Sequence, residues 1–206
     1  MTKKITILAF IAAFFAAGCG VSGPARNTRT GLATGVTPVA DAEVAVIEME
    51  DDAKYGKITL ELYSNIAPKT VAQFKALAKS GAYDGTTFHR INPSFIQGGD
   101  PLSKDNDPTN DGTGRSNKPN VPAEFSDIPY DSGILGMARG QDINSGNSQF
   151  FITLQREPGF DKNYTIFGKV IDGMIGVRTI SGVTPKNGER PVDAVKVKTI
   201  TIKPKE

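Results

Sequence analysis

Short stretches of alternating apolar and polar residues recur from residue 43 to the end of the chain. In residues 57–63, Ile58, Leu60 and Leu62 fall on one face and mostly polar residues fall on the other. A period of two is typical of a β-strand with one buried face. Similar stretches rich in Val, Ile, Thr and Phe, bounded by Gly, Asn, Asp and Pro, predict seven more strands at 43–50, 86–91, 95–100, 134–138, 149–154, 165–170 and 194–202.

Two segments have the period of an amphipathic helix instead. Pro68 suits the first turn of one helix, which carries apolar residues at 71, 74, 77 and 78 and can end at Gly81 in a left-handed conformation. The other helix is expected between Asp172, as its N-cap, and Gly182, with apolar residues at 174, 177 and 180. The chain is therefore mainly β with two α-helices.

The number of strands and the short connections between them indicate how the sheet is arranged. Eight short strands without long crossovers favour a closed antiparallel barrel, because closure removes the edges that otherwise promote aggregation. The two helices would cap its ends. A sandwich of two sheets satisfies the same pattern, so periodicity alone leaves both arrangements open.

The first residues have the features of an export signal. Lys3 and Lys4 precede an apolar run over 5–17, which is too short to span a membrane. The run ends in Ala16-Ala17-Gly18-Cys19, which resembles the lipobox of bacterial lipoproteins, although Ala16 stands where Leu is usual. We expect a signal peptide at 1–18 and a lipid anchor on Cys19; the alternative is an ordinary secretory signal followed by an incidental cysteine.

The next segment has no apolar period and is rich in Gly, Ser, Thr, Pro and Ala, so residues 19–40 are predicted to be the lipidated cysteine and a flexible linker. Such a linker would hold a domain at 41–206 clear of the lipid headgroups. The expected location is the bacterial cell envelope, on its periplasmic or outer face, with the membrane as a partner through the anchor.

Charge and composition narrow the possible chemistry. The formal net charge is +2, and removal of Lys3 and Lys4 with the leader leaves 2 − 2 = 0, which gives no reason to expect a nucleic acid partner. One Cys and one His exclude an internal disulfide and a Cys/His zinc site. Residues 105–116 are rich in Asp and Asn but lack the order of a calcium-binding EF-hand loop. We expect no metal and no cofactor.

Three long motifs carry a family resemblance. They are Tyr-Asp-Gly-Thr-Thr-Phe-His-Arg at 83–90 with Gln-Gly-Gly-Asp at 97–100, Gly-Ile-Leu-Gly-Met-Ala-Arg at 133–139, and Asn-Ser-Gln-Phe-Phe-Ile at 147–152. Together with Phe-Gly-Lys-Val at 167–170 they closely resemble the cyclophilins, over 44–202. The resemblance implies the cyclophilin barrel, eight antiparallel strands capped by two helices, and catalysis of rotation about X-Pro bonds.

The resemblance also implies roles for particular residues. The catalytic residues that it implies are Arg90, in the place of the catalytic arginine, Phe151, which forms the floor of the proline pocket, and Gln97, which lines the groove beside them. The remaining substrate-binding positions are the pocket residues Phe95, Ile96, Phe160 and Tyr164, the groove residue Gln149, the loop residue Gly112, and Ala138 and Arg139, whose backbone would pair with the substrate.

Two departures from the family pattern affect this assignment. Between Arg90 and Gln97 this chain has one residue fewer than the usual cyclophilin pattern. Either Phe95 therefore keeps the place of the pocket phenylalanine, or Ser94 falls there. Counted back from residue 167, Gly159 stands where the family has Trp or Phe, Phe160 where it has a pocket Leu, and Tyr164 where it has His.

The residue types suit bond rotation. The barrier to rotation comes from C–N double-bond character, and a guanidinium can donate to the nitrogen or oxygen of a twisted amide without being consumed as an acid. The expected function is an isomerase, acting as a monomer on proline-containing polypeptides, that assists the folding of exported proteins. The alternative is a binding module that holds such peptides with little turnover. His89 is left out of the site because the reaction needs no proton transfer.

Overall fold

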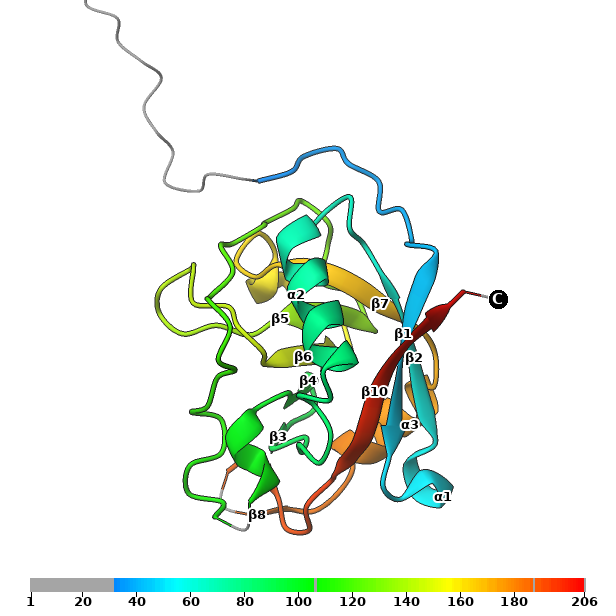
Figure 1. Ribbon diagram of the computed structural model, residues 1–206, viewed down its shortest axis with the longest axis vertical. Helices are drawn as coiled ribbons and strands as arrows, with labels where there is room; N and C mark the ends of the chain where they lie inside the picture. Colours follow the sequence, from blue (N-terminus) through cyan, green and yellow to red (C-terminus); the bar gives the residue numbers. More distant parts are fainter. Residues whose placement is uncertain (1–31, 106, 187, 206) are drawn as a thin grey trace, which may run out of the picture. The chain divides into compact units, whose positions relative to one another are not determined.

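The computed structural model describes residues 32–205 except 106 and 187, and in this part of the chain eight strands form one antiparallel sheet. Its order is β10-β1-β2-β7-β5-β6-β4-β3 (Figure 1). The strands are β1 Glu43–Met49, β2 Lys57–Leu62, β3 Arg90–Ile91, β4 Phe95–Gly98, β5 Ile134–Met137, β6 Phe150–Thr153, β7 Ile166–Asp172 and β10 Val197–Pro204. All eight predicted strands are present, and the sandwich is excluded because they share a single sheet.

The sheet is curled, but the closed barrel that we expected is not confirmed. β10 and β3 lie at the two ends of the strand order, and the described residues form no ladder between these two strands. An isolated bridge joins Thr87 to Lys196 in the segments that lead into them. β3 and β10 form no ladder because β3 has only two residues and its Ile91 N–H donates to the Glu189 carbonyl instead (2.6 Å). Glu189 lies between β8 (Pro185–Lys186) and β9 (Arg190–Pro191), a separate small hairpin.

The main core lies between the sheet and α2 (Pro68–Lys79). Ile58, Leu60 and Leu62 on β2 have no exposed surface, as their alternation predicted. On α2, the Phe74 ring packs against aromatic rings from three other segments at centroid distances of 5.3–5.7 Å. Burial of this apolar surface, at about 25 cal/mol per Å², is the dominant stabilising contribution.

The predicted first helix is confirmed at both ends. Pro68 occupies its first turn, and the chain leaves it at Gly81, whose φ of 70° is in the left-handed region. Its amino end is capped from a distance: the Glu124 carboxylate accepts hydrogen bonds from the N–H groups of Lys69 (3.1 Å) and Thr70 (2.9 Å). A negative charge is favourable at this end of a helix.

The second helix, α3 (Met174–Ser181), is present, but its N-cap is Gly173 and not Asp172. Asp172 is the last residue of β7. Gly173 has a φ of 88°, and a Cβ there would lie 2.1 Å from the Lys57 carbonyl oxygen. Only glycine fits this turn, so the close approach of two segments decides the cap.

A further short helix, α1 (Asp52–Tyr55), was not predicted. The Asp51 side chain caps it by accepting from the Lys54 N–H at 3.1 Å. It lies beside α3 (Figure 1), and a Cβ on Gly176 of α3 would lie 2.1 Å from the Tyr55 carbonyl oxygen.

Residues 33–41 run along the folded domain. The Ala33 N–H donates to the Phe125 carbonyl (2.8 Å), and the Asp127 N–H donates to the Ala33 carbonyl (3.0 Å). Further along, Asn65 donates to the Thr37 carbonyl (2.9 Å). The part of the predicted linker at 33–40 thus makes hydrogen bonds to the domain through its backbone groups.

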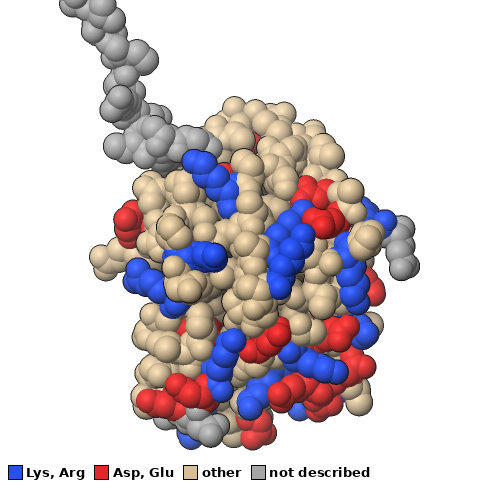
Figure 2. Space-filling model, in the orientation of Figure 1, with Lys and Arg blue, Asp and Glu red and all other residues tan. Residues whose placement is uncertain are grey.

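The predicted signal peptide at 1–18, Cys19 and the linker as far as residue 31 lie outside the described residues. Within the described part, no helix has both the length and the apolar character needed to cross a membrane. Figure 2 shows Lys and Arg interspersed with Asp and Glu on one face of the domain.

Candidate active site

Five aromatic rings form a cluster near the surface, which we call the site cluster: Phe95, Tyr130, Phe151, Phe160 and Tyr164. The Phe151 ring lies at its centre, with centroids 5.8 Å from Phe95, 5.7 Å from Tyr130, 5.4 Å from Phe160 and 5.5 Å from Tyr164. Phe151 is buried, whereas Phe160 and Tyr164 are partly exposed. The cluster therefore has a dry floor and an open side.

Strand β6 places Phe151 in this cluster by simple alternation. Its neighbour Phe150 points to the main core, so Phe151 points to the opposite face of the sheet. Gly136 on β5 is the cross-strand partner of Phe151, and a Cβ there would lie 2.3 Å from the Phe151 ring. Glycine at 136 leaves the space that the ring occupies.

The two registers left open by the sequence are distinguished by the fold. Phe95 lies in the site cluster, whereas Ile96 has no exposed surface and belongs to the main core. The expectation that the Ile96 side chain lines the pocket is therefore wrong, because strand alternation turns it inward. The Asn92 side chain sets this register by accepting from the N–H groups of Ser94 (2.8 Å) and Phe95 (2.9 Å).

Arg90 lies at the rim of the site cluster. Its guanidinium carbon is 4.8 Å from the centre of the Phe95 ring, a cation–π geometry. Nη1 donates to Gln97 Oε1 at 3.4 Å, and Nε donates to the carboxylate of Glu189. About half of the side chain (47%) is exposed, so the guanidinium can meet a ligand that enters the cluster.

A chain of amide groups continues from Arg90 along the groove. Gln97 Nε2 donates to Gln149 Oε1 at 2.9 Å, and Gln149 Nε2 donates to the carbonyls of Gly112 (3.0 Å) and Gly114 (2.8 Å). The Asp100 carboxylate accepts from the N–H groups of both glycines, which holds the loop. The sequence-predicted groove residues are thus brought together.

Ala138 and Arg139 lie on the other side of the groove. The Arg139 guanidinium carbon is 4.7 Å from the centre of the Tyr164 ring, and its Nε donates to the Asn163 carbonyl at 3.1 Å. Ala138 packs against the site cluster. A small pocket of about 240 Å³ joins both residues to Gln97, Gln149 and the glycine loop.

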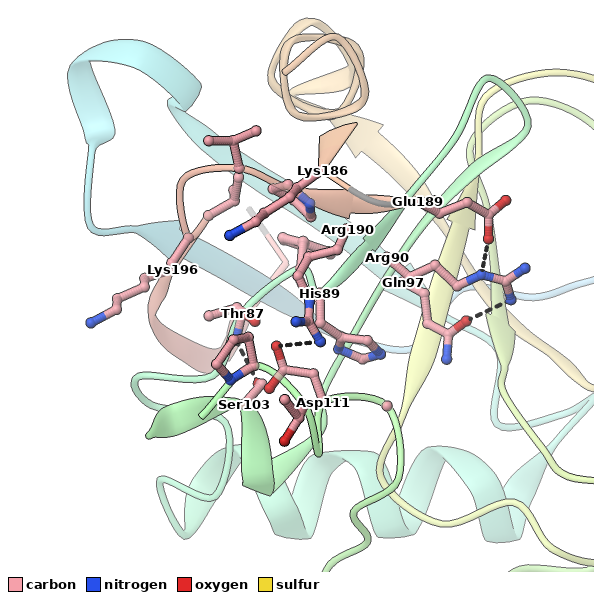
Figure 3. Close-up of a pocket in the computed structure, with 18 of the residues that line it drawn as sticks. Thr87, His89, Arg90, Gln97, Ser103, Asp111, Lys186, Glu189, Arg190 and Lys196 are labelled. Carbon is pink, nitrogen blue, oxygen red and sulfur yellow. Dashed lines mark hydrogen bonds and ion pairs between the residues drawn. The ribbon is translucent and has the colours of Figure 1, made fainter. Parts of the chain in front are cut away.

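A larger cavity of about 830 Å³ lies beside Arg90 (Figure 3). Arg90 and Gln97 line this cavity as well as the site, but none of the five rings of the site cluster lines it. His89 lines it and is 7% exposed, with no hydrogen-bond partner for either ring nitrogen among the described residues. Burial lowers the pKa of His89 below its ordinary value, so the imidazole is neutral at physiological pH.

Three residues of this region were missed by sequence reasoning. Tyr130 stacks on Phe151, and burial raises the pKa of its hydroxyl well above the ordinary value. The Asn92 side chain accepts a hydrogen bond from the Phe95 N–H, and the Glu189 carboxylate accepts one from Arg90 Nε. Tyr130 lies in a loop without periodicity, and Glu189 is 99 residues from Arg90, so neither gives a local signal. The described residues contain no group of three or more potential metal ligands.

Most of the chain is similar to known proteins. Residues 46–202 match the family model described as cyclophilin type peptidyl-prolyl cis-trans isomerase/CLD. A probable peptidyl-prolyl cis-trans isomerase of Brucella suis is 46% identical over 155 residues, which are 72% of this chain and 78% of the relative. A peptidyl-prolyl cis-trans isomerase of Schizosaccharomyces pombe is 38% identical over 156 residues, 72% of this chain and 94% of the relative.

Solved structures give the same result. A cyclophilin type peptidyl-prolyl cis-trans isomerase of Cryptosporidium parvum, crystallised in the presence of the dipeptide Ala-Pro, is similar with a TM-score of 0.70 and 33% sequence identity. The similarity covers 79% of this chain and 99% of that chain.

Proposed function

Because the chain belongs to the cyclophilin-type peptidyl-prolyl cis/trans isomerase family, we propose that it rotates X-Pro bonds at the site cluster beside Arg90. Isomerase activity is the property of the family. We choose this site because the Arg90 guanidinium lies at the rim of a dry aromatic floor centred on Phe151.

The chemistry follows from the barrier to rotation, about 18–20 kcal/mol, which arises from conjugation between the amide nitrogen and the carbonyl. In the twisted transition state the nitrogen becomes pyramidal and basic, so a donor aimed at it binds this state better than the planar ground state. Arg90 supplies such donors and stays charged throughout the reaction. Exclusion of water by the rings strengthens this interaction.

The site cluster is the proposed proline pocket. Phe151 forms the floor, and Phe95, Phe160 and Tyr164 form walls that can hold a pyrrolidine ring while the preceding residue swings. The similar Cryptosporidium parvum protein was crystallised in the presence of Ala-Pro, which supports a proline-containing peptide as the ligand. Gln97, Gln149, Gly112, Ala138 and Arg139 then line the path of the flanking chain.

The test is an isomerisation assay on a proline tetrapeptide with the purified full chain. Arg90→Ala and Arg90→Lys should each lower kcat/KM at least tenfold, about 1.4 kcal/mol of transition-state stabilisation, while the circular dichroism spectrum is unchanged. The lysine variant keeps the charge but loses the planar fork. Full activity in both variants would contradict the role of Arg90. Peptide binding without measurable turnover by the unmutated chain would instead favour the proline-peptide binding module.

We also propose that the protein is exported and anchored through a lipid on Cys19, and that it assists the folding of other exported proteins as a monomer. The support is the sequence alone: a charged and apolar leader, then Ala-Gly before the sole cysteine. Two acyl groups would be needed for stable anchoring, because one chain binds only marginally.

In cells fed radiolabelled palmitate, Cys19→Ser should abolish labelling and release the protein from carbonate-washed membranes. A variant that stays in the membrane pellet would contradict the anchor. Sedimentation of the purified protein checks that it is a monomer.

A further inference from the structure

Glu189 is tied to the strand that carries Arg90 at three points. Its backbone carbonyl accepts from the Ile91 N–H at 2.6 Å, and its carboxylate accepts from Asn92 Nδ2 at 2.6 Å. The carboxylate also accepts from Arg90 Nε (Figure 3). Burial alone would raise the pKa of Glu189, but the hydrogen bonds from Arg90 and Asn92 outweigh this and hold the pKa below its usual value. The carboxylate is therefore ionised at neutral pH.

These contacts fix the plane of the Arg90 guanidinium. Glu189 holds the Nε edge, Gln97 holds Nη1 through a longer bond of 3.4 Å, and the Phe95 ring covers one face. A rigid planar group restrained on two edges and one face has little rotational freedom left. Among the described residues no acceptor for the Nη2 hydrogens is found, so these donors remain available to a ligand.

The pairing contributes to orientation more than to stability. The side chains of Arg90 and Glu189 are 47% and 40% exposed, and ion pairs with this exposure add little to the stability of a fold. Glu189 also binds Asn92, whose own side chain sets the turn that places Phe95. The Glu189 carboxylate thus connects Arg90 to Asn92, the residue that positions the Phe95 ring.

We propose that Glu189 is a positioning residue for the isomerase, which holds the Arg90 guanidinium in the orientation that binds the twisted amide. This inference rests on the proposed role of Arg90. Without the carboxylate, the weaker Gln97 bond and the Phe95 face leave the guanidinium free to turn toward solvent, and a misplaced group loses transition-state stabilisation.

The first test uses Glu189→Gln in the full chain, assayed with a proline tetrapeptide. We expect kcat to fall about tenfold with KM within about twofold of wild type, since orientation matters most in the transition state. Asp193→Asn, on the segment that follows β9, is the matched control because it removes an exposed charge in the same region, and its kcat should equal that of wild type. An unchanged kcat in Glu189→Gln would overturn the proposal.

A spectroscopic readout separates positioning from a general structural role. The Arg90 Nε–H resonance, assigned by its loss in Arg90→Ala, should be sharp and slow to exchange in the wild-type protein and broadened or lost in Glu189→Gln. Glu189→Asp keeps a carboxylate and should restore part of both the signal and kcat. A resonance unchanged in Glu189→Gln would overturn the proposal.

A double-mutant cycle completes the test. Glu189→Gln should cause no further loss in an Arg90→Ala background, because the carboxylate acts through the arginine. An additional tenfold loss there would show a role independent of Arg90 and overturn the inference. If Arg90→Ala alone kept full activity, the proposed function of Arg90 would fall as well, whereas a loss in Arg90→Ala with full activity in Glu189→Gln would overturn only the role of Glu189.

Discussion

Phe150 and Phe151 are neighbours on β6, yet they belong to two different aromatic clusters. Phe150 packs in the core cluster, which we define as Phe74, Tyr83, Phe88, Phe150 and Phe167. Phe151 is the centre of the site cluster. Strand alternation alone separates the two rings by sending successive side chains to opposite faces.

The two clusters differ in what surrounds the rings. All five rings of the core cluster are fully buried, and Phe74, Phe150 and Phe167 lie on α2, β6 and β7, regular elements with clear periodicity. The site cluster takes Tyr130, Phe160 and Tyr164 from outside the strands. Guanidinium groups lie over two of its rings, Arg90 over Phe95 and Arg139 over Tyr164. Aromatic residues therefore stabilise the fold in one place and form the proposed binding surface in the other.

The largest effect on stability is expected from Phe150→Ala. The ring contacts Phe74, Tyr83 and Phe88 at centroid distances of 5.7–6.1 Å, and its loss leaves a closed cavity. We expect the free energy of unfolding to fall by about 3–5 kcal/mol. Urea denaturation measures the change, and kcat/KM per folded molecule should stay near wild type. A specific loss of activity would mean that the clusters are not separate in function.

Phe151→Ala should lower the activity strongly and the stability less than Phe150→Ala does. We expect kcat/KM to fall at least tenfold, because the floor of the proposed proline pocket is removed. The loss of stability should be smaller than for Phe150→Ala, since the gap opens to the surface and water can enter it. The comparison is contradicted if Phe151→Ala destabilises the protein more than Phe150→Ala while leaving the activity of the folded fraction intact.

A pair of glycines sharpens the comparison. A Cβ at Gly136 would press on the Phe151 ring at 2.3 Å, whereas a Cβ at Gly159 would meet no atom within 4 Å. Gly136→Ala should lower the free energy of unfolding by about 1–3 kcal/mol and reduce kcat/KM several-fold by displacing the ring. Gly159→Ala is the control and should change neither quantity. Equal effects of the two variants would show that the Phe151 position is not what limits activity.

The smallest effect concerns His89, which belongs to neither cluster. Burial lowers the pKa of His89, opposed by the nearby Asp100 carboxylate, so the folded state disfavours the charged imidazole. As the pH falls, the unfolded chain binds a proton on His89 at a higher pH than the folded protein does. The neutral imidazole therefore contributes stability above about pH 6.5, and this contribution is lost as the pH falls from there through the pKa of the folded state.

Thermal unfolding of wild type and His89→Gln between about pH 5 and 7.5 measures this contribution, and the variant should have the shallower pH dependence. Turnover per folded molecule should not follow it, since rotation transfers no proton. A kcat that titrates with His89 would place the imidazole in the reaction.

The sequence predicted some elements well because their signals are local. The apolar stripe of α2 and the glycine at its end lie within 14 residues, from Pro68 to Gly81. The N-cap of α3 was misplaced because Gly173 is required by the Lys57 carbonyl, a contact from a distant strand. In the proposed site, Arg90, Gln97 and Phe151 were predicted from a family resemblance and not from any property that distinguishes them along the chain.

By itself, the sequence of this protein determined the eight strands of the main sheet, the helices α2 and α3 and the family, because periodicity and motifs are written in neighbouring positions. Only the tertiary structure decided that Phe95 and not Ile96 enters the site cluster, that Tyr130 lies beneath Phe151, and that Glu189 meets Arg90. It also left the sheet curled without a ladder between β10 and β3 among the residues that the structure describes. The physical reason is that these outcomes depend on contacts between segments far apart in the chain, and such contacts form only when the whole sheet and its loops pack together.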